Sequence, residues 1–268
     1  MEVHGWEAGL AEGPELVIGV EDATVEPYAT ILSYPKADKT ALASRIRQLH
    51  ELGVRELEFV GRLKLGRLSL LGKGVAGMVV IGRNGRERIA LKIRRIDSRR
   101  DSVRHEASML KAANNVDVGP AYYGSTSDII SMELVEGESL PEWLGTLVGR
   151  GRRSRLRETA GILLQQCLRL DDAGLDHGEL SRAHKNVSVS REGGPVILDF
   201  ESASWDRRPS NVTSITQYFF LGGGFARRVH RILGATDIGL LKQALRSYKF
   251  EKSPDAFCRL LKLLRLQL

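Results

Sequence analysis

Cysteine is scarce in this chain of 268 residues, and long apolar runs are missing. The two cysteines, Cys167 and Cys258, lie far apart in apolar helical surroundings, which favours small core residues in a reducing compartment over a disulfide or a metal pair. No run of about 18 apolar residues occurs, so neither a membrane span nor a membrane partner is expected. The N-terminus has no basic stretch ahead of an apolar core, which argues against a secretory signal. Cytoplasmic localisation is therefore the default expectation.

Internal repeats and low-complexity tracts are also missing, and the 42% hydrophobic and 27% charged content is typical of a globular protein. Charge is unevenly placed. Residues 1–60 carry 11 acidic and five basic residues, whereas the remainder carries 22 acidic and 35 basic residues. A basic body fits contact with RNA or a ribonucleoprotein. It equally fits a solvated surface with arginines that handle a phosphorylated ligand.

Residues 1–56 are expected to form an appended α/β extension. Its predicted elements are a loose tail with a weak strand at Glu15–Val20, a strand at Tyr28–Tyr34 and a helix from Lys39 to Leu52. Asp38 stands where an N-cap belongs, and Gly53 stands where a helix commonly ends. Leu42, Ile46 and Leu49 share one face of this helix, so we expect the following lobe to cover them.

The remaining chain divides into a strand-rich half and a helical half. Strands are predicted at Leu57–Val60, Arg67–Leu71, Met78–Gly82, Ile89–Ile93, Asp128–Val135 and Pro195–Phe200. Helices are predicted at Asp101–Ala113, Leu156–Ala173, Thr213–Phe220, Phe225–Leu233 and Ile238–Leu268. Asn84-Gly85 is a strong hairpin turn signal between two of the strands. The order favours an α+β fold, with a strand-rich lobe at residues 57–137 and a helical lobe at residues 138–268, over a Rossmann sheet.

Three motifs follow one another along these two halves. The first is a glycine-rich run, Gly72-Lys73-Gly74-Val75-Ala76-Gly77-Met78-Val79, followed by Ala90-Leu91-Lys92. The second is His177-Gly178-Glu179-Leu180 with Asn186 downstream, and the third is Ile197-Leu198-Asp199-Phe200. Glycines have no Cβ, so a glycine-rich hairpin can approach phosphates closely. A strand follows the glycine run, where a dinucleotide site would need a helix.

In this order and at these intervals, the motifs resemble the signature set of protein kinases. The resemblance implies a bilobal protein-kinase-like fold that uses ATP with Mg²⁺ or Mn²⁺. It assigns nucleotide contacts to Gly72, Lys73, Gly74, Gly77, Val79, Ala90, Lys92, Met132, Glu133 and Val135. Val79 would pack on the adenine ring, Met132 would be the gatekeeper, and the main chain of Glu133 and Val135 would pair with adenine. On residue types alone, this last segment equally fits an ordinary edge strand.

The same resemblance assigns the phosphate chemistry. In a kinase, the lysine at the position of Lys92 reaches the α- and β-phosphates and is held by a helix carboxylate. Glu106 fits that carboxylate better than Asp101, which lies too near the helix start; a plain surface glutamate is the alternative. Asp199 and Asn186 would bind the metal ion, with a strand-end capping role as the alternative for Asp199.

The catalytic loop departs from the kinase pattern H-x-D-x-x-x-x-N. Glu179 replaces the aspartate that accepts the hydroxyl proton, and seven positions rather than five separate it from Asn186. Glutamate can act as a base, and transfer depends on its close positioning. Asp176 is a rival base. Ser181 replaces the usual lysine two residues after the base, so charge on the γ-phosphate would come from Arg182, His184 or Lys185.

The segment after the third motif also departs from the kinase pattern. Glu201 follows Asp199-Phe200 where kinases have glycine, which makes the peptide flip of many regulated kinases less available. No A-P-E motif follows, so the peptide-docking segment is expected to be very short. Ordering of this segment by phosphorylation is therefore not expected to control the protein.

The chain resembles the small atypical kinases of the RIO and KEOPS-associated lineage in two segments. The first is His177-Gly178-Glu179-Leu180-Ser181, where that lineage typically reads H-G-D-L-[ST]. The second is Asp199-Phe200-Glu201-Ser202-Ala203-Ser204. With two further segments, the chain is most similar to a group of predicted archaeal serine/threonine protein kinases. These segments are Ala90-Leu91-Lys92-Ile93-Arg94-Arg95 and Ser210-Asn211-Val212-Thr213-Ser214-Ile215. The resemblance covers Leu57 to about Gly222, and Tyr28–Gly53 fits the group too.

The resemblance implies an atypical ATP-dependent Ser/Thr protein kinase that transfers the γ-phosphate to a protein hydroxyl, its own included. Three alternatives stay open: an ATPase-type switch acting on an RNA–protein assembly, a small-molecule kinase of the aminoglycoside-phosphotransferase type, and a pseudokinase scaffold. The small-molecule type would prefer an acidic substrate cleft, and the helical half has no acidic cluster. Retention of Lys92, Glu106, Asn186 and Asp199 argues against a scaffold. The protein substrate and the oligomeric state stay open.

Overall fold

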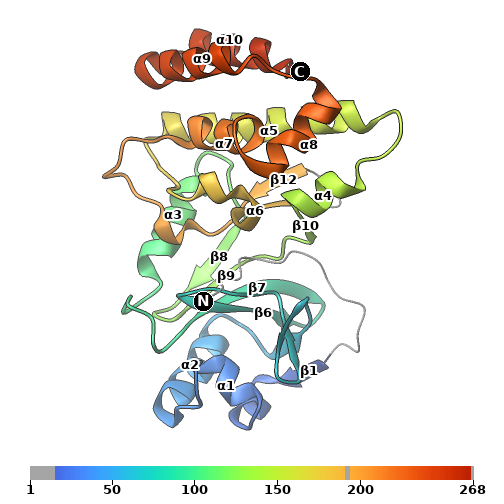
Figure 1. Ribbon diagram of the computed structural model, residues 1–268. Helices are drawn as coiled ribbons and strands as arrows, with labels where there is room; N and C mark the ends of the chain where they lie inside the picture. Colours follow the sequence, from blue (N-terminus) through green and yellow to red (C-terminus); the bar gives the residue numbers. More distant parts are fainter. Residues whose placement is uncertain (1–15, 191–193, 267–268) are drawn as a thin grey trace.

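The computed structural model describes residues 16–190 and 194–266. Figure 1 shows an α+β arrangement in which an antiparallel sheet and the two N-terminal helices lie towards one end and the helices of residues 140–264 lie at the other. The sheet-rich part comes first in the chain and the helical part second, as predicted. Within the described ranges, no helix is both long and apolar enough to cross a bilayer.

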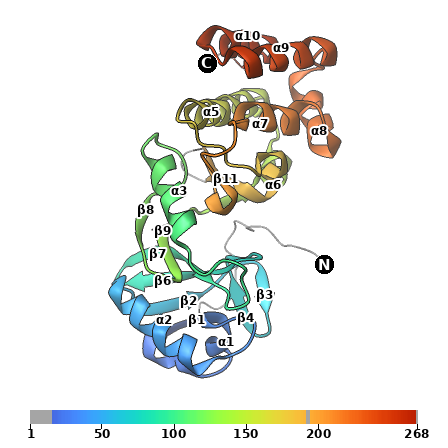
Figure 2. The same ribbon diagram turned by 90° about the vertical axis from the view of Figure 1, so that its left-hand side faces the viewer.

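The main sheet is antiparallel, with its strands in the order β1-β2-β6-β7-β9-β8 and β5 paired to β6. Its strands are β1 (Leu16–Gly19), β2 (Glu56–Phe59), β5 (Gly72–Lys73), β6 (Gly77–Asn84), β7 (Glu87–Arg94), β8 (Tyr122–Ser125) and β9 (Ile129–Glu133). A separate hairpin, β3 (Leu63–Leu65) with β4 (Leu68–Leu70), packs beside β2 and β6 (Figure 2). Gly85 turns β6 into β7 with φ of +63°, the left-handed conformation that the Asn-Gly pair predicts.

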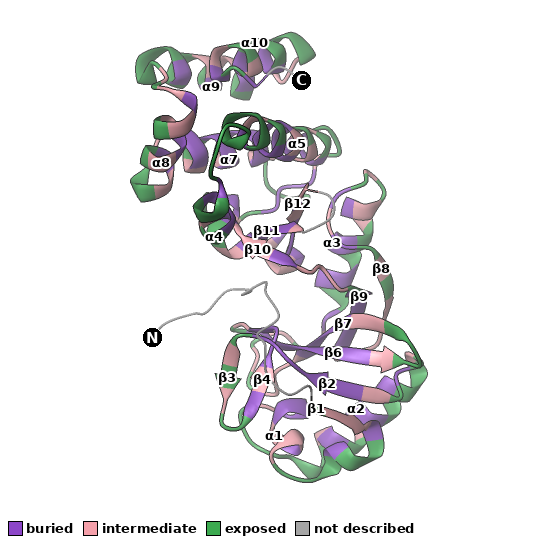
Figure 3. Ribbon diagram, turned by 90° about the vertical axis from the view of Figure 1, so that its right-hand side faces the viewer, coloured by how far each residue is buried: buried purple, intermediate pink, exposed green. Residues whose placement is uncertain are grey.

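The two faces of this sheet pack against different layers, because side chains alternate along each strand. On β6, Met78 and Val80 belong to one buried cluster, whereas Val79 and Ile81 belong to the other. Figure 3 shows β2 and β6 buried along most of their length, and β7 is buried over residues 90–93. The first cluster includes the N-terminal helices, and the second continues through α3 (Arg104–Asn114) into the helical part.

The N-terminal helices cover the first face of the sheet (Figures 1 and 2). The predicted helix after Asp38 is confirmed as α2 (Lys39–Glu51). The Asp38 carboxylate accepts a hydrogen bond of 2.8 Å from the Ala41 amide, and Gly53 follows the helix with φ of +74°. Its expected apolar face is buried in one cluster with the sheet, through Leu42, Ile46 and Leu49. Residues 16–56 therefore share a core with the strands that follow them.

The prediction of a strand at Tyr28–Tyr34 is wrong. This run forms the short helix α1 (Tyr28–Leu32), which begins directly after Pro27. Periodicity alone does not separate a short apolar strand from a buried helical turn. In the structure β1 occupies the place beside β2, and the helical form buries Ala29, Ile31 and Leu32 together with α2. Tertiary packing decides the conformation here.

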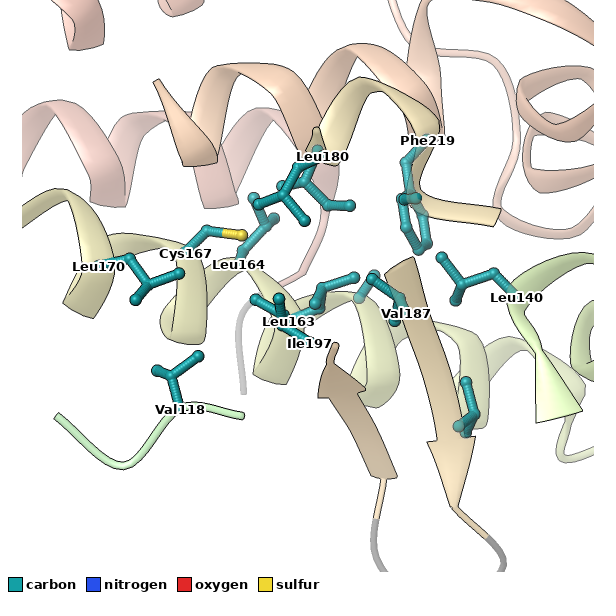
Figure 4. Packing of buried hydrophobic residues seen from close by; sticks show 14 of the residues in the cluster. Val118, Leu140, Leu163, Leu164, Cys167, Leu170, Leu180, Val187, Ile197 and Phe219 are labelled. Carbon is teal, nitrogen blue, oxygen red and sulfur yellow. The ribbon is translucent and has the colours of Figure 1, made fainter. Parts of the chain in front are cut away.

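The second part of the chain is built around α5 (Arg152–Asp172). Its other elements are α4 (Leu140–Thr146), α6 (Ala183–Asn186), α7 (Asn211–Phe220), α8 (Gly223–Leu233), α9 (Ile238–Glu251), α10 (Pro254–Leu264) and a sheet of β10 (Gly137–Ser139), β11 (Val187–Ser190) and β12 (Gly194–Ile197). Figure 4 shows Leu163 of α5 towards Ile197 and Val187, and Leu164 towards Leu180. This core holds in place the loop between α5 and β11 and the segment that follows β12.

The single helix predicted over Ile238–Leu268 is wrong, because the chain forms two helices there. Lys252 adopts a left-handed conformation with φ of +45°, and Pro254 then starts α10. The Ser253 hydroxyl accepts a hydrogen bond of 3.2 Å from the Ala256 amide and caps the new helix. Proline lacks the amide hydrogen that a continuous helix needs, so Pro254 itself accounts for the break.

The cysteines occupy different environments. Cys167 on α5 is buried, as expected for a small core residue. Cys258 on α10 is exposed, so its expected core position is wrong. The buried face of α10 is formed by Ala256, Phe257 and Leu260, and Cys258 lies outside this face.

Candidate active site

The glycine-rich run forms a tight hairpin between β5 and β6. The Gly74 amide donates a hydrogen bond of 2.8 Å to the Gly77 carbonyl. A Cβ at Gly77 would lie 3.1 Å from both Lys92 Cγ and the Ile93 carbonyl oxygen. Glycine at this position therefore lets the hairpin backbone lie directly against the Lys92 side chain. Val79 pairs with Lys92 across β6 and β7, so the hairpin and the lysine share one surface.

Lys92 connects the sheet to two distant elements. Its Nζ donates to Glu106 Oε1 on α3 at 2.7 Å and to Asp199 Oδ1 at 2.8 Å. Glu201 Oε2 lies 3.7 Å from the same nitrogen. Lys92 and Glu106 are buried, with 4% and 7% of their surfaces exposed. Three parts of the chain thus meet at one ammonium group.

Three carboxylates around one ammonium group leave an excess of negative charge. Burial raises the pKa of Glu106 to about 7, and the charges of Asp199 and Glu201 add to this while Lys92 opposes it. Burial also disfavours ionised Asp199, but Lys92 outweighs it and holds the Asp199 pKa below its usual range. Burial opposes charge on Lys92 too, yet the carboxylates raise the Lys92 pKa above its usual value. A cation here would relieve the repulsion among the carboxylates.

Asp199 follows β12 in a left-handed conformation with φ of +63°. Aspartate tolerates this region better than most residues. The next side chain, Phe200, is buried with its ring 5.1 Å from the ring of His177. His177 Nε2 in turn donates to the Leu198 carbonyl at 2.9 Å, and burial lowers the pKa of His177. The hydrogen bond to Leu198 and the ring contact with Phe200 anchor the loop after α5 to the segment that carries Asp199.

The loop predicted to be catalytic brings Glu179 and Asn186 together, although it is two positions longer than the kinase pattern. A 3₁₀ turn at Leu180–Arg182 and the short helix α6 take up the two additional positions. Asn186 Nδ2 donates to the Glu179 carbonyl at 3.2 Å and lies 3.4 Å from Glu179 Oε2. Glu179 Oε1 accepts a hydrogen bond of 3.1 Å from the Ser202 hydroxyl. The Glu179 carboxylate is therefore oriented by groups on both sides.

Asp176 has a different environment from Glu179. Its carboxylate accepts hydrogen bonds of 2.8 Å from Arg207 Nε and 3.0 Å from the Ser210 amide. Its backbone pairs with Ser204, and the residue is buried. Asp176 thus holds the loop to the segment after Asp199.

A cavity of about 200 Å³, here called the Lys92 cavity, lies between the glycine hairpin and the catalytic loop. The expected site residues that line it are Gly72, Lys73, Gly74, Gly77, Val79, Lys92, Glu179, Asn186 and Asp199. It is also lined by Val75, Arg182, Lys185, Glu201 and Ser202. Of the two candidate bases, Glu179 lines this cavity and Asp176 does not.

Of the residues expected near adenine, Val79 lines the Lys92 cavity, whereas Ala90, Met132, Glu133 and Val135 do not. Ala90 and Met132 pair across β7 and β9, and both are buried. The Glu133 amide donates to the Ala121 carbonyl at 2.8 Å, so this amide is already used within the protein. Val135 follows β9 and is partly exposed.

Sequence reasoning misses two residues that line the cavity, Glu201 and Ser202. Glu201 is interpreted only as the replacement of a glycine, yet its carboxylate lies near Lys92 and 3.4 Å from Arg100 Nε. The 3₁₀ turn at Phe200–Ser202 brings both side chains to the cavity. The available signal is an acid and a hydroxyl placed directly after Asp199, the aspartate predicted to bind the metal.

Carboxylate oxygens of Glu106, Asp199 and Glu201 lie within 4.8 Å of one another. This spacing and chemistry suit a hard divalent cation, which prefers oxygen ligands. Of the two residues predicted to bind the metal, Asp199 belongs to this group, and Asn186 lines the Lys92 cavity.

Neither a scan against protein-family models nor a search of curated proteins found a match for this chain. The likeness to a kinase family therefore rests on the motifs alone.

Proposed function

We propose that this chain is an ATP-dependent phosphotransferase of the atypical Ser/Thr protein kinase type, with a bilobal kinase-like fold. The observation that carries the proposal is the double contact of Lys92 Nζ with Glu106 and Asp199 beside a glycine hairpin. A lysine held between two carboxylates is positioned to bind phosphate oxygens, and glycines leave room for those phosphates. The Glu179 carboxylate lines the same cavity and supplies a base.

The residues present fit a divalent cation. Asp199 would hold it through a carboxylate oxygen, and Asn186 through its amide oxygen, since the Asn186 amide nitrogen already donates to Glu179. Glu201 offers a further carboxylate. Burial raises the pKa of Glu106, and the charges of Asp199 and Glu201 raise it further; a cation would offset those charges. When bound, Mg²⁺ supplies charge neutralisation on the phosphates.

In the proposed reaction, Lys92 orients the α- and β-phosphates and Glu106 keeps the lysine in place. Glu179 accepts the proton of the acceptor hydroxyl as that oxygen bonds to the γ-phosphorus. Arg182 and Lys185 line the cavity and place positive charge near the transferred group. Val79 and the strand around Met132 would bound the adenine ring.

An ATPase-type switch on an RNA–protein assembly is the second candidate. It is favoured by exposed arginines at the start of α5: Arg150, Arg152, Arg153 and Arg155. The first turn of α5 has no acidic residue, and basic groups there oppose the helix dipole. Arg153 donates to the Ile232 and Leu233 carbonyls at the end of α8. Helix stability does not account for Arg150, Arg152 and Arg155, whereas a phosphate-rich partner would.

Radiolabelled ATP separates the two candidates. The kinase proposal expects label on an added acceptor protein, with loss of labelling in Lys92→Ala. Lys64→Ala is the matched control, because Lys64 is an exposed lysine on β3 that contacts Ser69 and does not line the Lys92 cavity. Release of inorganic phosphate without protein labelling would favour the ATPase switch instead. Normal labelling by folded Lys92→Ala would refute the proposed site.

A further inference from the structure

Ser202 places a hydroxyl group at the candidate base. Its Oγ donates to Glu179 Oε1 at 3.1 Å, and both residues line the Lys92 cavity. Among the described residues that line this cavity, Ser202 is the one with a hydroxyl side chain. A base that already accepts a hydrogen bond from a hydroxyl is within reach of that proton.

We propose that Ser202 is the acceptor of an intramolecular phosphoryl transfer, an inference that rests on the proposed function. Ser202 Oγ attacks the γ-phosphorus of ATP, and the bond between that phosphorus and the β–γ bridging oxygen breaks. ADP leaves with the electron pair of that bond. The Oγ proton passes to Glu179 Oε1 and then to solvent. The products are ADP, phosphoserine at position 202 and one proton.

The backbone around Ser202 is held in place without a substrate-docking segment. Arg207 Nη2 donates to the Ser202 carbonyl at 2.5 Å, and Arg207 Nε is itself fixed by Asp176 at 2.8 Å. Ser202 also ends the 3₁₀ turn that begins directly after Asp199. The acceptor hydroxyl is therefore positioned by the same contacts that position the catalytic loop.

The surroundings of Ser202 also suit the product. Arg182 and Lys185 line the same cavity, so a phosphate dianion on Ser202 would lie near two positive charges. The phosphorylated oxygen has no proton to donate to Glu179. Each chain can thus accept one phosphate here.

Ser204 provides a matched comparison two positions along the chain. Its hydroxyl donates to Asp206 Oδ2 at 3.4 Å, and Ser204 does not line the Lys92 cavity. Transfer guided by Glu179 should therefore select Ser202 over Ser204.

Mass spectrometry of the full chain tests this proposal. Phosphatase-treated protein is incubated with ATP and Mg²⁺ and digested with trypsin, which yields the peptide Glu192–Arg207 with both serines. Fragment spectra should place phosphate on Ser202, approaching one per chain, at a first-order rate that does not change with protein concentration. Ser202→Ala should lose this phosphate, and Ser204→Ala should keep it. Phosphate on other residues with Ser202 unmodified would overturn the inference, as would a rate proportional to protein concentration.

An added acceptor protein, casein, separates this inference from the proposed function. Labelled casein with unmodified Ser202 would refute the Ser202 step and leave the kinase proposal standing. Label on neither would refute both. In a mixture with wild-type protein, a tagged Lys92→Ala chain should stay unphosphorylated at Ser202, and its phosphorylation there would contradict transfer within one chain.

Discussion

Replacing Glu106 by glutamine tests what it costs to ionise a buried carboxylate beside the charges of Asp199 and Glu201. The two side chains have nearly the same shape, so the substitution changes charge with little change in packing. Glu106 is buried, and its carboxylate contacts Lys92 while two further carboxylates lie close by. We expect wild-type protein to lose stability with rising pH over a range in which Glu106→Gln does not.

The direction and size of this effect follow from the pKa of Glu106. An unfolded glutamate loses its proton near pH 4.5, whereas folded Glu106 keeps it to about pH 7. Between these values the folded state binds more protons than the unfolded state, so the free energy of unfolding falls as pH rises. At about 1.4 kcal/mol per unit, the full shift corresponds to at most about 3–4 kcal/mol. Glutamine does not titrate, so the variant lacks this loss.

Urea unfolding at pH 5 and pH 8 without divalent metal measures the difference. Between these pH values, wild-type protein should lose about 2–3 kcal/mol more free energy of unfolding than Glu106→Gln. Other titrating groups are common to both proteins and cancel in the comparison. Added Mg²⁺ should reduce the difference, because a cation offsets the same charge. An equal pH dependence of the two proteins would refute the reasoning.

Three further predictions address the metal, the base and the N-terminal helices. Asp199→Asn should reduce Mg²⁺-dependent phosphate transfer about a hundredfold or more, because an amide cannot offset the metal charge; identical Mg²⁺ titrations of variant and wild type would contradict this role. Glu179→Gln should abolish transfer to a hydroxyl and keep ATP binding by calorimetry, whereas normal transfer by Glu179→Gln together with its loss in Asp176→Asn would reassign the base. Leu49→Ala should cost about 3 kcal/mol of stability and lower the melting temperature by roughly 6–12 °C, because Leu49 is fully buried. Arg47→Ala, at an exposed position of the same helix, is the control, and an equal melting temperature for both variants would show that α2 does not share the core of the sheet.

Local signals predicted the elements that have local causes. Asp38 capped the expected helix, and Gly85 turned the expected hairpin, because caps and turns are decided by a few neighbouring residues. The run Tyr28–Tyr34 was assigned wrongly, since its conformation depends on packing against α2, which lies later in the chain. The break at Pro254 had a local signal, which the continuous apolar pattern outweighed.

The candidate site shows the same difference between features with local signals and features that depend on distant contacts. Glu106 was identified from its helix position, and the structure places it 2.7 Å from Lys92 Nζ. Which of the two candidate bases lines the cavity could not be predicted from the sequence. The answer depends on Arg207, which binds Asp176 and lies 31 residues later in the chain. Ser202 was missed for a related reason: its contact with Glu179 exists only after two segments fold against each other.

Transfer of the γ-phosphate to a protein hydroxyl is the central claim, and phosphoamino-acid analysis after incubation with γ-labelled ATP tests it most directly. Wild-type protein with Mg²⁺ should place label in acid-stable phosphoserine or phosphothreonine, and Lys92→Ala should not, although both remain folded by circular dichroism. Chelation of the metal should remove the label from the wild-type reaction as well. Absence of phosphoserine and phosphothreonine in the wild-type reaction, or equal labelling by folded Lys92→Ala, would contradict the account.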